Sequence, residues 1–153
     1  MRSKDIRSYL EEMESTLGTE VFKESDPVDL AESSGYDLLF VSGRILGLIH
    51  EGRAFVTVRG ALEYSPQKRY VTVDMGAVPF VTKGADVMAP GIVDADPEIV
   101  PGQLVWIRDQ RNSVPLAVGE SMLSGPEMVA ASAGKAITNI HHVGDKLWKY
   151  EEP

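Results

Sequence analysis

The chain has 153 residues, of which 43% are hydrophobic, and a formal net charge of −8 at pH 7. This length suits one ordinary domain or two small ones, and the acidic balance argues against nonspecific binding to nucleic-acid phosphates, which a basic surface normally supports. Cysteine is absent, which excludes disulfides, thiolate catalysis and cysteine-based zinc sites. No run of the sequence approaches the ~20 apolar residues of a membrane helix.

The first predicted element is an amphipathic helix over residues 3–17. Its apolar residues recur at three- and four-residue spacing, at Ile6, Tyr9, Leu10, Met13 and Leu17. Gly18 is a natural stop for this helix. We interpret the apolar face as core packing, with a partner-binding groove as the alternative. Because the N-terminus is acidic and unlike a signal peptide, a cytoplasmic protein is expected.

A polar loop, with a short turn of helix at most, is predicted over residues 23–35. Three short apolar runs follow it, separated by turns that contain glycine, at residues 36–41, 44–50 and 53–58. Such spacing predicts antiparallel hairpins, with the first helix covering one face of the small sheet. A brief helix and a linker are predicted over residues 59–69, and we place the domain boundary after residue 67.

The second half is predicted to be mostly strand. The predicted strands cover residues 69–75, 101–109, 115–121 and 135–143, and residues 145–150 close the series. Strands so short and so closely spaced are typical of a small, closed or nearly closed barrel.

Two short helices are predicted to interrupt these strands. One lies near residues 77–83, with Pro79 in its first turn and Gly84 as its C-terminal cap. The other begins at Ser124, which forms the capping-box pattern with Glu127.

Small residues are unusually dense between Gly76 and Gly91. Turns and positive φ angles account for most of the individual glycines. As a unit, however, KGADVMAPGI (residues 83–92) is expected to build a groove in which another backbone can lie close. It is not a phosphate-binding loop, because it matches neither GxxxxGK[ST] nor GxGxxG.

The segments GAVPFVTKGADVMAPGI, VPGQLVWIRD, PLAVGES and GKAITNIHHVGDKLW together resemble the PUA domain. This RNA-binding module is named after pseudouridine synthases and archaeosine transglycosylases. The resemblance covers residues 69–150. The helix and meander before it resemble the pre-PUA domain of archaeal relatives of the translation re-initiation factors, the ligatin-like and density-regulated-protein-partner group.

The resemblance implies an α+β fold, with a small N-terminal helix-and-meander domain (residues 1–67) followed by a PUA pseudo-β-barrel (residues 68–153). In that family RNA lies in a groove made by the first helix of the barrel, the loop after it and a late strand. The RNA-binding residues implied by position are Lys83, Gly84, Ala85, Asp86, Met88, Ala89, Pro90, Gly91, Lys135, Asn139 and His141. Among these, Lys83 and Lys135 would supply positive charge.

The function implied by the resemblance is noncatalytic binding of structured RNA, such as tRNA ends or ribosomal RNA, in translation or on the ribosome. Two alternatives stay open. One is a protein-interaction module that docks on a ribosomal or translation-factor partner through the meander. The other is an accessory subunit of an RNA-modifying enzyme. No cofactor, membrane or DNA partner is expected.

Histidines and carboxylates give no catalytic or metal-binding pattern. His141 and His142 are adjacent on a predicted strand and face opposite ways, so they cannot share one metal ion. Asp74 is interpreted as a cap for the helix that follows it. Asp94 and Asp96 are interpreted as a solvated turn. No Ser/His/Asp arrangement has a recognisable context, so no enzyme is expected.

Both tryptophans are predicted to lie in strands. Trp106 and Trp148 have apolar neighbours, and we interpret them as core residues rather than as stacking platforms.

Overall fold

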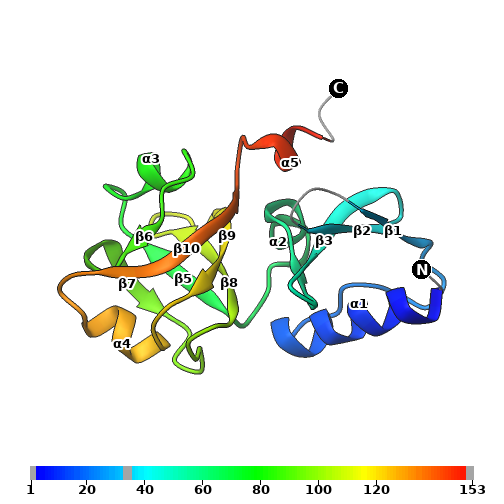
Figure 1. The fold of residues 1–153 in the computed structure, drawn as a ribbon, viewed down its shortest axis with the longest axis horizontal. Helices are drawn as coiled ribbons and strands as arrows, with labels where there is room; N and C mark the ends of the chain where they lie inside the picture. The colour runs from blue at the N-terminus through cyan, green and yellow to red at the C-terminus, as the bar shows by residue number, and fades with distance from the viewer. Residues whose placement is uncertain (1–2, 33–35, 151–153) are drawn as a thin grey trace. The chain divides into compact units, whose positions relative to one another are not determined.

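The computed structural model describes residues 3–32 and 36–150 (Figure 1). The chain divides into two compact units that meet between Lys68 and Arg69. The elements of the N-terminal unit are, in chain order, α1 (Ser3–Leu17), β1 (Val28–Glu32), β2 (Asp37–Val41), β3 (Arg44–His50), β4 (Arg53–Val56) and α2 (Val58–Tyr64).

The predicted first helix is confirmed as α1. Its apolar face is buried through Ile6, Leu10, Met13 and Leu17, and the helix packs against β1 and β4. Gly18 ends it with a φ of 70° and donates its backbone N–H to the carbonyl of Glu14 at 3.0 Å. The apolar face is therefore core packing.

The N-terminal sheet is an antiparallel meander in the order β1-β2-β3-β4. The three predicted apolar strands are confirmed as β2, β3 and β4. The prediction of a polar loop before them was wrong in part, because β1 forms there and places Leu30 opposite Leu39. As an edge strand, β1 exposes Asp29 and Glu32, and its composition therefore looked like that of a loop.

The brief helix α2 is fixed to β3 by its first turn. The hydroxyl of Thr57 accepts a hydrogen bond from Gly60 N at 3.0 Å and donates one to Ile45 O at 3.0 Å. A Cβ added at Gly60 would collide with the carbonyl oxygen of Leu46. The glycine thus lets the helix backbone lie directly on the strand.

The C-terminal unit is a curled sheet with short helices. Its elements are β5 (Tyr70–Val73), α3 (Val78–Val81), β6 (Val87–Met88), a 3-10 turn η1 (Ala89–Gly91), β7 (Ile92–Ala95), β8 (Leu104–Asp109), β9 (Pro115–Ser121), α4 (Gly125–Ala130), β10 (Lys135–His142) and α5 (Lys146–Lys149). The strand order is β6-β10-β9-β8-β5-β7, and only the β5–β8 pair is parallel among the strand pairs described.

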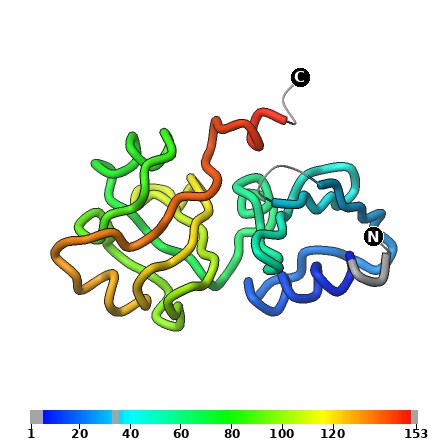
Figure 2. The backbone as a smooth tube through the Cα atoms, in the orientation of Figure 1, coloured from blue at the N-terminus to red at the C-terminus, as the bar shows by residue number. Residues whose placement is uncertain are grey.

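The two edges of this sheet are brought together by the chain itself. β6 and β7 lie at opposite ends of the strand order, yet only η1 separates them in sequence. The sheet must therefore curl, and the backbone trace of this unit follows such a curve (Figure 2). Inside the curve lies an apolar core that includes Val71, Ile107 and Ile137. The predicted pseudo-barrel is confirmed.

Local signals placed the two inner helices correctly. Ser124 and Glu127 form both hydrogen bonds of the capping box at the start of α4. Pro79 lies in the first turn of α3, as predicted. The helix ends at Val81 with Thr82 as its C-cap, so the prediction of Gly84 as the cap was wrong; Gly84, with a φ of 95°, lies in the turn that follows.

The closing segment was expected with the strands and is instead the helix α5. Asp145 begins this helix, because its carboxylate accepts a hydrogen bond from Trp148 N at 2.9 Å. Trp148 is therefore a partly buried helix residue, whereas Trp106 is buried on β8 as expected. No helix within residues 3–32 and 36–150 has the length and apolar character needed to span a membrane.

Candidate nucleic-acid interface

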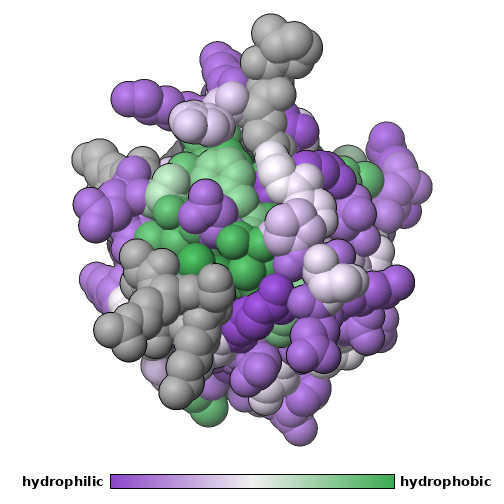
Figure 3. Space-filling model, turned by 90° about the vertical axis from the view of Figure 1, so that its right-hand side faces the viewer, coloured by the Kyte–Doolittle hydropathy of each residue, from purple (hydrophilic) through white to green (hydrophobic). Residues whose placement is uncertain are grey.

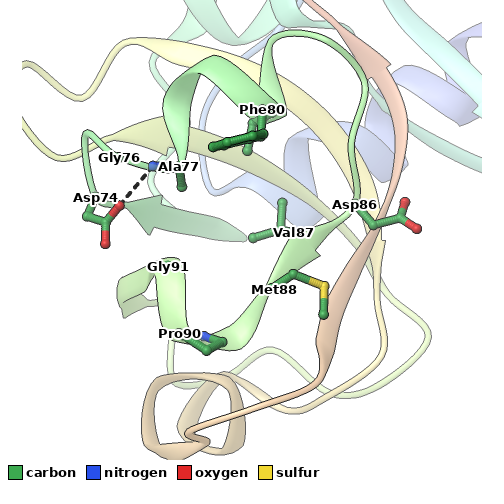
Figure 4. A pocket seen from close by; sticks show the side chains of 10 residues that line it. Asp74, Gly76, Ala77, Phe80, Asp86, Val87, Met88, Pro90 and Gly91 are labelled. Atoms are coloured by element: carbon green, nitrogen blue, oxygen red, sulfur yellow. Dashed lines mark hydrogen bonds between the residues drawn. The ribbon is translucent and has the colours of Figure 1, made fainter.

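An open pocket of about 350 Å³ lies in the C-terminal unit, at the end of β5 and beside β6. It is built entirely by the glycine-rich stretch between β5 and β7 (Figure 4). The lining residues are Asp74, Gly76, Ala77, Phe80, Val81, Asp86, Val87, Met88, Pro90 and Gly91.

Backbone contacts at the end of β5 shape one side of the pocket. Asp74 donates its N–H to Gly91 O at 2.8 Å, which ties the two ends of the stretch together. The carboxylate of Asp74 accepts from Ala77 N at 2.9 Å and so fixes the turn before α3. A Cβ added at Gly91 would lie 3.1 Å from the Cβ of Ala77, so this side has little space for larger residues.

Two exposed apolar side chains lie on opposite sides of the pocket. Figure 4 shows Phe80 on one side and Met88 and Pro90 on the other, with Val87 between them. Phe80 is 66% exposed and Met88 50% exposed, whereas Val87 is buried. Large apolar side chains that remain in water beside a concave surface are typical of a binding site.

The carboxylate of Asp86 is neutralised from outside the pocket. It accepts a hydrogen bond from Asn139 N at 2.9 Å and pairs with Lys135 Nζ at 3.2 Å. The hydrogen bond from Asn139, followed by the bond and charge of Lys135, holds the pKa of Asp86 below its usual value. Figure 4 shows this carboxylate turned away from the other lining residues. The ion pair joins the residue before β6 to the first residue of β10, beside the pocket.

Asn139 holds the loop that follows α3. Its side-chain amide donates to Val81 O at 3.2 Å and to Ala85 O at 3.0 Å. Together with the bond to Asp86, these contacts fix the loop against β10. Asn139 therefore acts on the pocket by positioning its walls.

Gly84 and His142 approach each other closely at the same loop. A Cβ at Gly84 would lie 3.0 Å from His142 Nε2, and the φ of 95° also favours glycine there. His142 Nδ1 lies 2.9 Å from Val143 O, a carbonyl that can only accept, so Nδ1 carries a proton. In the neutral ring, Nε2 is then an acceptor that faces the loop.

His141 lies away from the pocket. It is 1% exposed, and its Nδ1 lies 2.8 Å from Asp145 Oδ2. A β-bulge between Asn139 and His141 shifts the register of β10 and moves His141 to the other face of the strand. The structure therefore places His141 as a structural residue that orients the cap of α5.

The hydrogen bonds of the Asp145 carboxylate predict that the stability of the fold falls in acid. Burial raises the pKa of Asp145, but hydrogen bonds from His141, Trp148 N and His142 N and the charge of His141 lower it to about 2. Because the folded-state pKa lies below the ordinary ~3.9, Asp145 stabilises the fold above pH ~4 and loses this effect as the pH falls toward 2. After allowance for solvent screening, we expect Asp145→Asn to lower the free energy of unfolding by about 1–2 kcal/mol at pH 6.

Urea denaturation between pH 6 and pH 3 measures this effect. The difference between wild type and Asp145→Asn should shrink as the pH falls. Asp94→Asn, at an exposed position of β7, is the matched control and should show a smaller difference. A difference for Asp145→Asn that does not change with pH would contradict the interpretation.

The structure brings together only part of the predicted set. Asp86, Met88, Pro90 and Gly91 line the pocket, and Lys135 and Asn139 contact Asp86 from β10. The remaining predicted residues lie outside the lining: Lys83, Gly84 and Ala85 in the loop, and Ala89 and His141 in buried positions.

Sequence reasoning did not propose Phe80 and treated Asp74 only as a cap. Neighbouring residues of a helix point in different directions, so Phe80 and Val81 could not both be expected in the core, but the sequence does not show which of them is exposed. Asp94 and Asp96 also differ from the expected solvated turn. Asp96 is buried and accepts a hydrogen bond from Arg69 N at 2.7 Å, whereas Asp94 is an exposed residue of β7.

Within the described part of the chain, no group of three His, Asp or Glu side chains could hold a metal ion. A ligand in the pocket would meet apolar side chains and backbone groups. It would also meet the carboxylate of Asp74 at the pocket edge, whereas the carboxylate of Asp86 is turned away.

A helix-and-meander unit followed by a curled barrel with this pocket defines a protein of the PUA type. Residues 69–143 match the family model described as the PUA domain. The chain is also 34% identical to an uncharacterized protein of Methanocaldococcus jannaschii, across 99% of this chain and 94% of that protein. The chain belongs to the PUA-domain family.

Two further relatives show how far the likeness extends. A crystal structure of a hypothetical protein from Pyrococcus horikoshii has a TM-score of 0.86 and 32% identity, with 97% of this chain and 96% of that chain covered. Translation machinery-associated protein 20 of Saccharomyces cerevisiae is 37% identical over 86 residues, which are 52% of this chain and 48% of that protein. The chain thus spans about half the length of the yeast relative.

Proposed function

We propose that this protein binds structured RNA in translation by taking an unpaired nucleotide into the pocket between Phe80 and Met88. The observation that carries the proposal is the open, apolar pocket with a large exposed side chain, Phe80 or Met88, on each of two sides. Membership of the PUA family supports binding to RNA. The name of the yeast relative supports a role in translation. Binding is noncatalytic in this proposal.

An unpaired base suits this pocket better than a phosphate does. The whole chain carries a charge of −8, and the pocket edge holds the carboxylate of Asp74, so a phosphate inside it would be repelled. A base can instead place its ring against Phe80 and Met88, and stacking on an aromatic side chain contributes ~1–3 kcal/mol per base. The volume of about 350 Å³ lies at the small end of ligand pockets, which suits one ring system rather than a duplex.

Asp74 gives the pocket a preference among bases. A carboxylate accepts hydrogen bonds, and the exocyclic amino groups of adenine and cytosine donate them, whereas uracil presents carbonyl oxygens at the same position. We therefore expect an unpaired base that carries an amino group, such as adenine or cytosine, to bind more tightly than uracil. The unpaired end of a tRNA and an exposed loop of ribosomal RNA are the substrates that we propose.

Labelled RNA hairpins test the proposal directly. The full chain should bind a hairpin with an unpaired adenosine or cytidine tail more tightly than the same hairpin with a uridine tail, and the blunt hairpin least. Fluorescence anisotropy at two salt concentrations gives the dissociation constants, and intact tRNA serves as the natural comparison. Equal affinity for tailed and blunt hairpins, or no binding at either salt concentration, would overturn the proposal.

A second candidate function is docking on a protein of the translation machinery. Figure 3 shows a face of the molecule on which apolar side chains gather in a patch edged by polar ones. In the N-terminal unit, Leu62 on α2 is an exposed large apolar residue. Co-sedimentation with ribosomes before and after ribonuclease treatment separates the two functions, because docking on protein survives the treatment and binding to RNA does not.

A further inference from the structure

A lysine at the start of the last strand lies at the rim of the pocket. Lys135 is the first residue of β10, and in the antiparallel pairing of β10 with β6 its Cα lies opposite that of Met88, which lines the pocket. Its Nζ lies 3.2 Å from Oδ2 of Asp86, another lining residue. A backbone pairing and a side-chain contact therefore both place this cation beside the pocket.

The pocket itself supplies no positive charge. Among the residues that the structure describes, ten line the pocket, and none of these is a lysine or an arginine. When a base lies in this apolar space, its phosphate must lie outside, where the RNA strand crosses the rim. Lys135 is joined to a lining residue by a described ion pair and is therefore a cation available to a phosphate at that rim.

The two oxygens of the Asp86 carboxylate have separate partners. Oδ1 accepts the hydrogen bond from Asn139 N at 2.9 Å, whereas Oδ2 faces Lys135 Nζ. Figure 4 shows the carboxylate turned away from the other lining residues. One oxygen thus fixes the loop against β10, and the other neutralises the lysine. The ion pair can be lost while the hydrogen bond that fixes the loop remains.

The ion pair between Asp86 and Lys135 is open to solvent. The side chain of Lys135 is 41% exposed and that of Asp86 40% exposed. An ion pair with such exposure contributes little to stability, because water and salt screen both charges. The stem of lysine is also flexible, so its ammonium can turn to a new partner. A phosphate at the rim can therefore replace the carboxylate without opening the barrel.

We propose that Asp86 masks Lys135 in the free protein, and that Lys135 exchanges this carboxylate for an RNA phosphate when an unpaired base occupies the pocket. This inference rests on the proposed function. Asp86 then lowers the affinity for RNA although it lines the pocket, because its pair with Lys135 must be broken first. The exchange gives a chain with a net charge of −8 one free positive charge where a phosphate crosses the rim.

Asp86→Asn tests the masking, because an amide keeps an oxygen for Asn139 N and removes the charge that holds Lys135. With the adenosine-tailed hairpin as probe, it should tighten binding about two- to fivefold at low salt, the range that an exposed ion pair supports. The slope of log Kd against log salt concentration should rise by about 0.7, because Lys135 then neutralises one phosphate and leaves no carboxylate to take up a cation. Unchanged or weaker binding would overturn the masking.

Glu98→Gln is the control for net charge. Glu98 is exposed in the loop between β7 and β8, outside the pocket lining, and its replacement removes one negative charge as Asp86→Asn does. It should change the affinity and the salt slope far less. Equal effects of the two variants would show that net charge alone sets the affinity and would overturn the masking.

A double-mutant cycle separates masking from direct repulsion of RNA by Asp86. Lys135→Gln should weaken binding severalfold, and most of the gain from Asp86→Asn should vanish when both changes are combined. A gain of the same size with and without Lys135 would show that Asp86 repels RNA by itself, contrary to the proposal.

Thermal unfolding of each variant reports whether the barrel is intact. If Asp86→Asn does not fold, Lys135→Gln is compared with Lys149→Gln, which removes the same charge at an exposed position of α5. Lys135→Gln should weaken binding severalfold more than Lys149→Gln, and equal effects would overturn the exchange. Failure of the proposed function looks different, because wild type itself would then not distinguish tailed from blunt hairpins, and the exchange would fall with it.

Discussion

Replacing Phe80 with alanine is expected to weaken binding of the adenosine-tailed hairpin by about 5- to 150-fold, the range that ~1–3 kcal/mol of base stacking gives. Phe80 is largely exposed on α3, so its removal leaves no cavity in the core. Stability should therefore stay within about 0.5 kcal/mol of wild type, as for other surface substitutions. Anisotropy titration measures the affinity, and thermal unfolding measures the stability.

Val129→Ala is the matched control for Phe80→Ala. Val129 lies on α4, outside the pocket lining, and its side chain is 44% exposed. Its replacement by alanine therefore also removes exposed apolar surface. It should leave the affinity unchanged. Phe80→Leu should give an intermediate affinity, because it keeps apolar area but loses the ring face. Full affinity in Phe80→Ala would remove the main support for base binding in this pocket.

Gly60→Ala is expected to have the largest effect on the stability of the N-terminal unit. The added Cβ would collide with the carbonyl of Leu46, and this backbone atom on β3 cannot move without shifting the strand. Overpacking of this kind costs about 1–3 kcal/mol or more, which exceeds the ~1 kcal/mol that alanine gains over glycine in a helix. Amide hydrogen exchange in α2 and β3 should become faster by the factor that corresponds to this loss of stability.

Gly76→Ala is the control for this change. A Cβ there meets only the Asp74 carboxylate, at the ordinary contact distance of 3.4 Å, and its φ is not in the left-handed region. It should change global stability little. Unchanged exchange rates in Gly60→Ala would show that α2 moves off the strand at little cost, contrary to the packing described.

Elements with local signals were predictable from the sequence. In α1 the apolar residues recur at helical spacing, and at the start of α4 Ser124 and Glu127 form a capping box. β1 was missed because its polar sequence becomes a strand only through pairing with β2, a contact between distant residues. α5 was missed although Asp145 is a suitable cap, because the apolar residues before it favoured continued strand.

The pocket was located by its small residues, but the side chains in it were not. Composition predicted a groove at residues 83–92, and residues 86–91 form one side of the pocket, whereas the other side comes from residues 74–81, which the prediction did not include. The partnership of Lys135 with Asp86 depends on the pairing of β10 with β6, which places Lys135 opposite Met88. The face on which His141 lies depends on a bulge after Asn139, and alternation along a strand cannot reveal a bulge.

The closure of the curled sheet through η1 gives the pocket a mechanical role. Its walls come from the end of β5, from α3 and from the short β6–η1 crossing, which is the seam where the first and last strands of the sheet order meet. A ligand seated there fastens that seam. If RNA occupies the pocket as proposed, binding and barrel stability are thermodynamically linked, and bound RNA would stabilise the fold that recognises it.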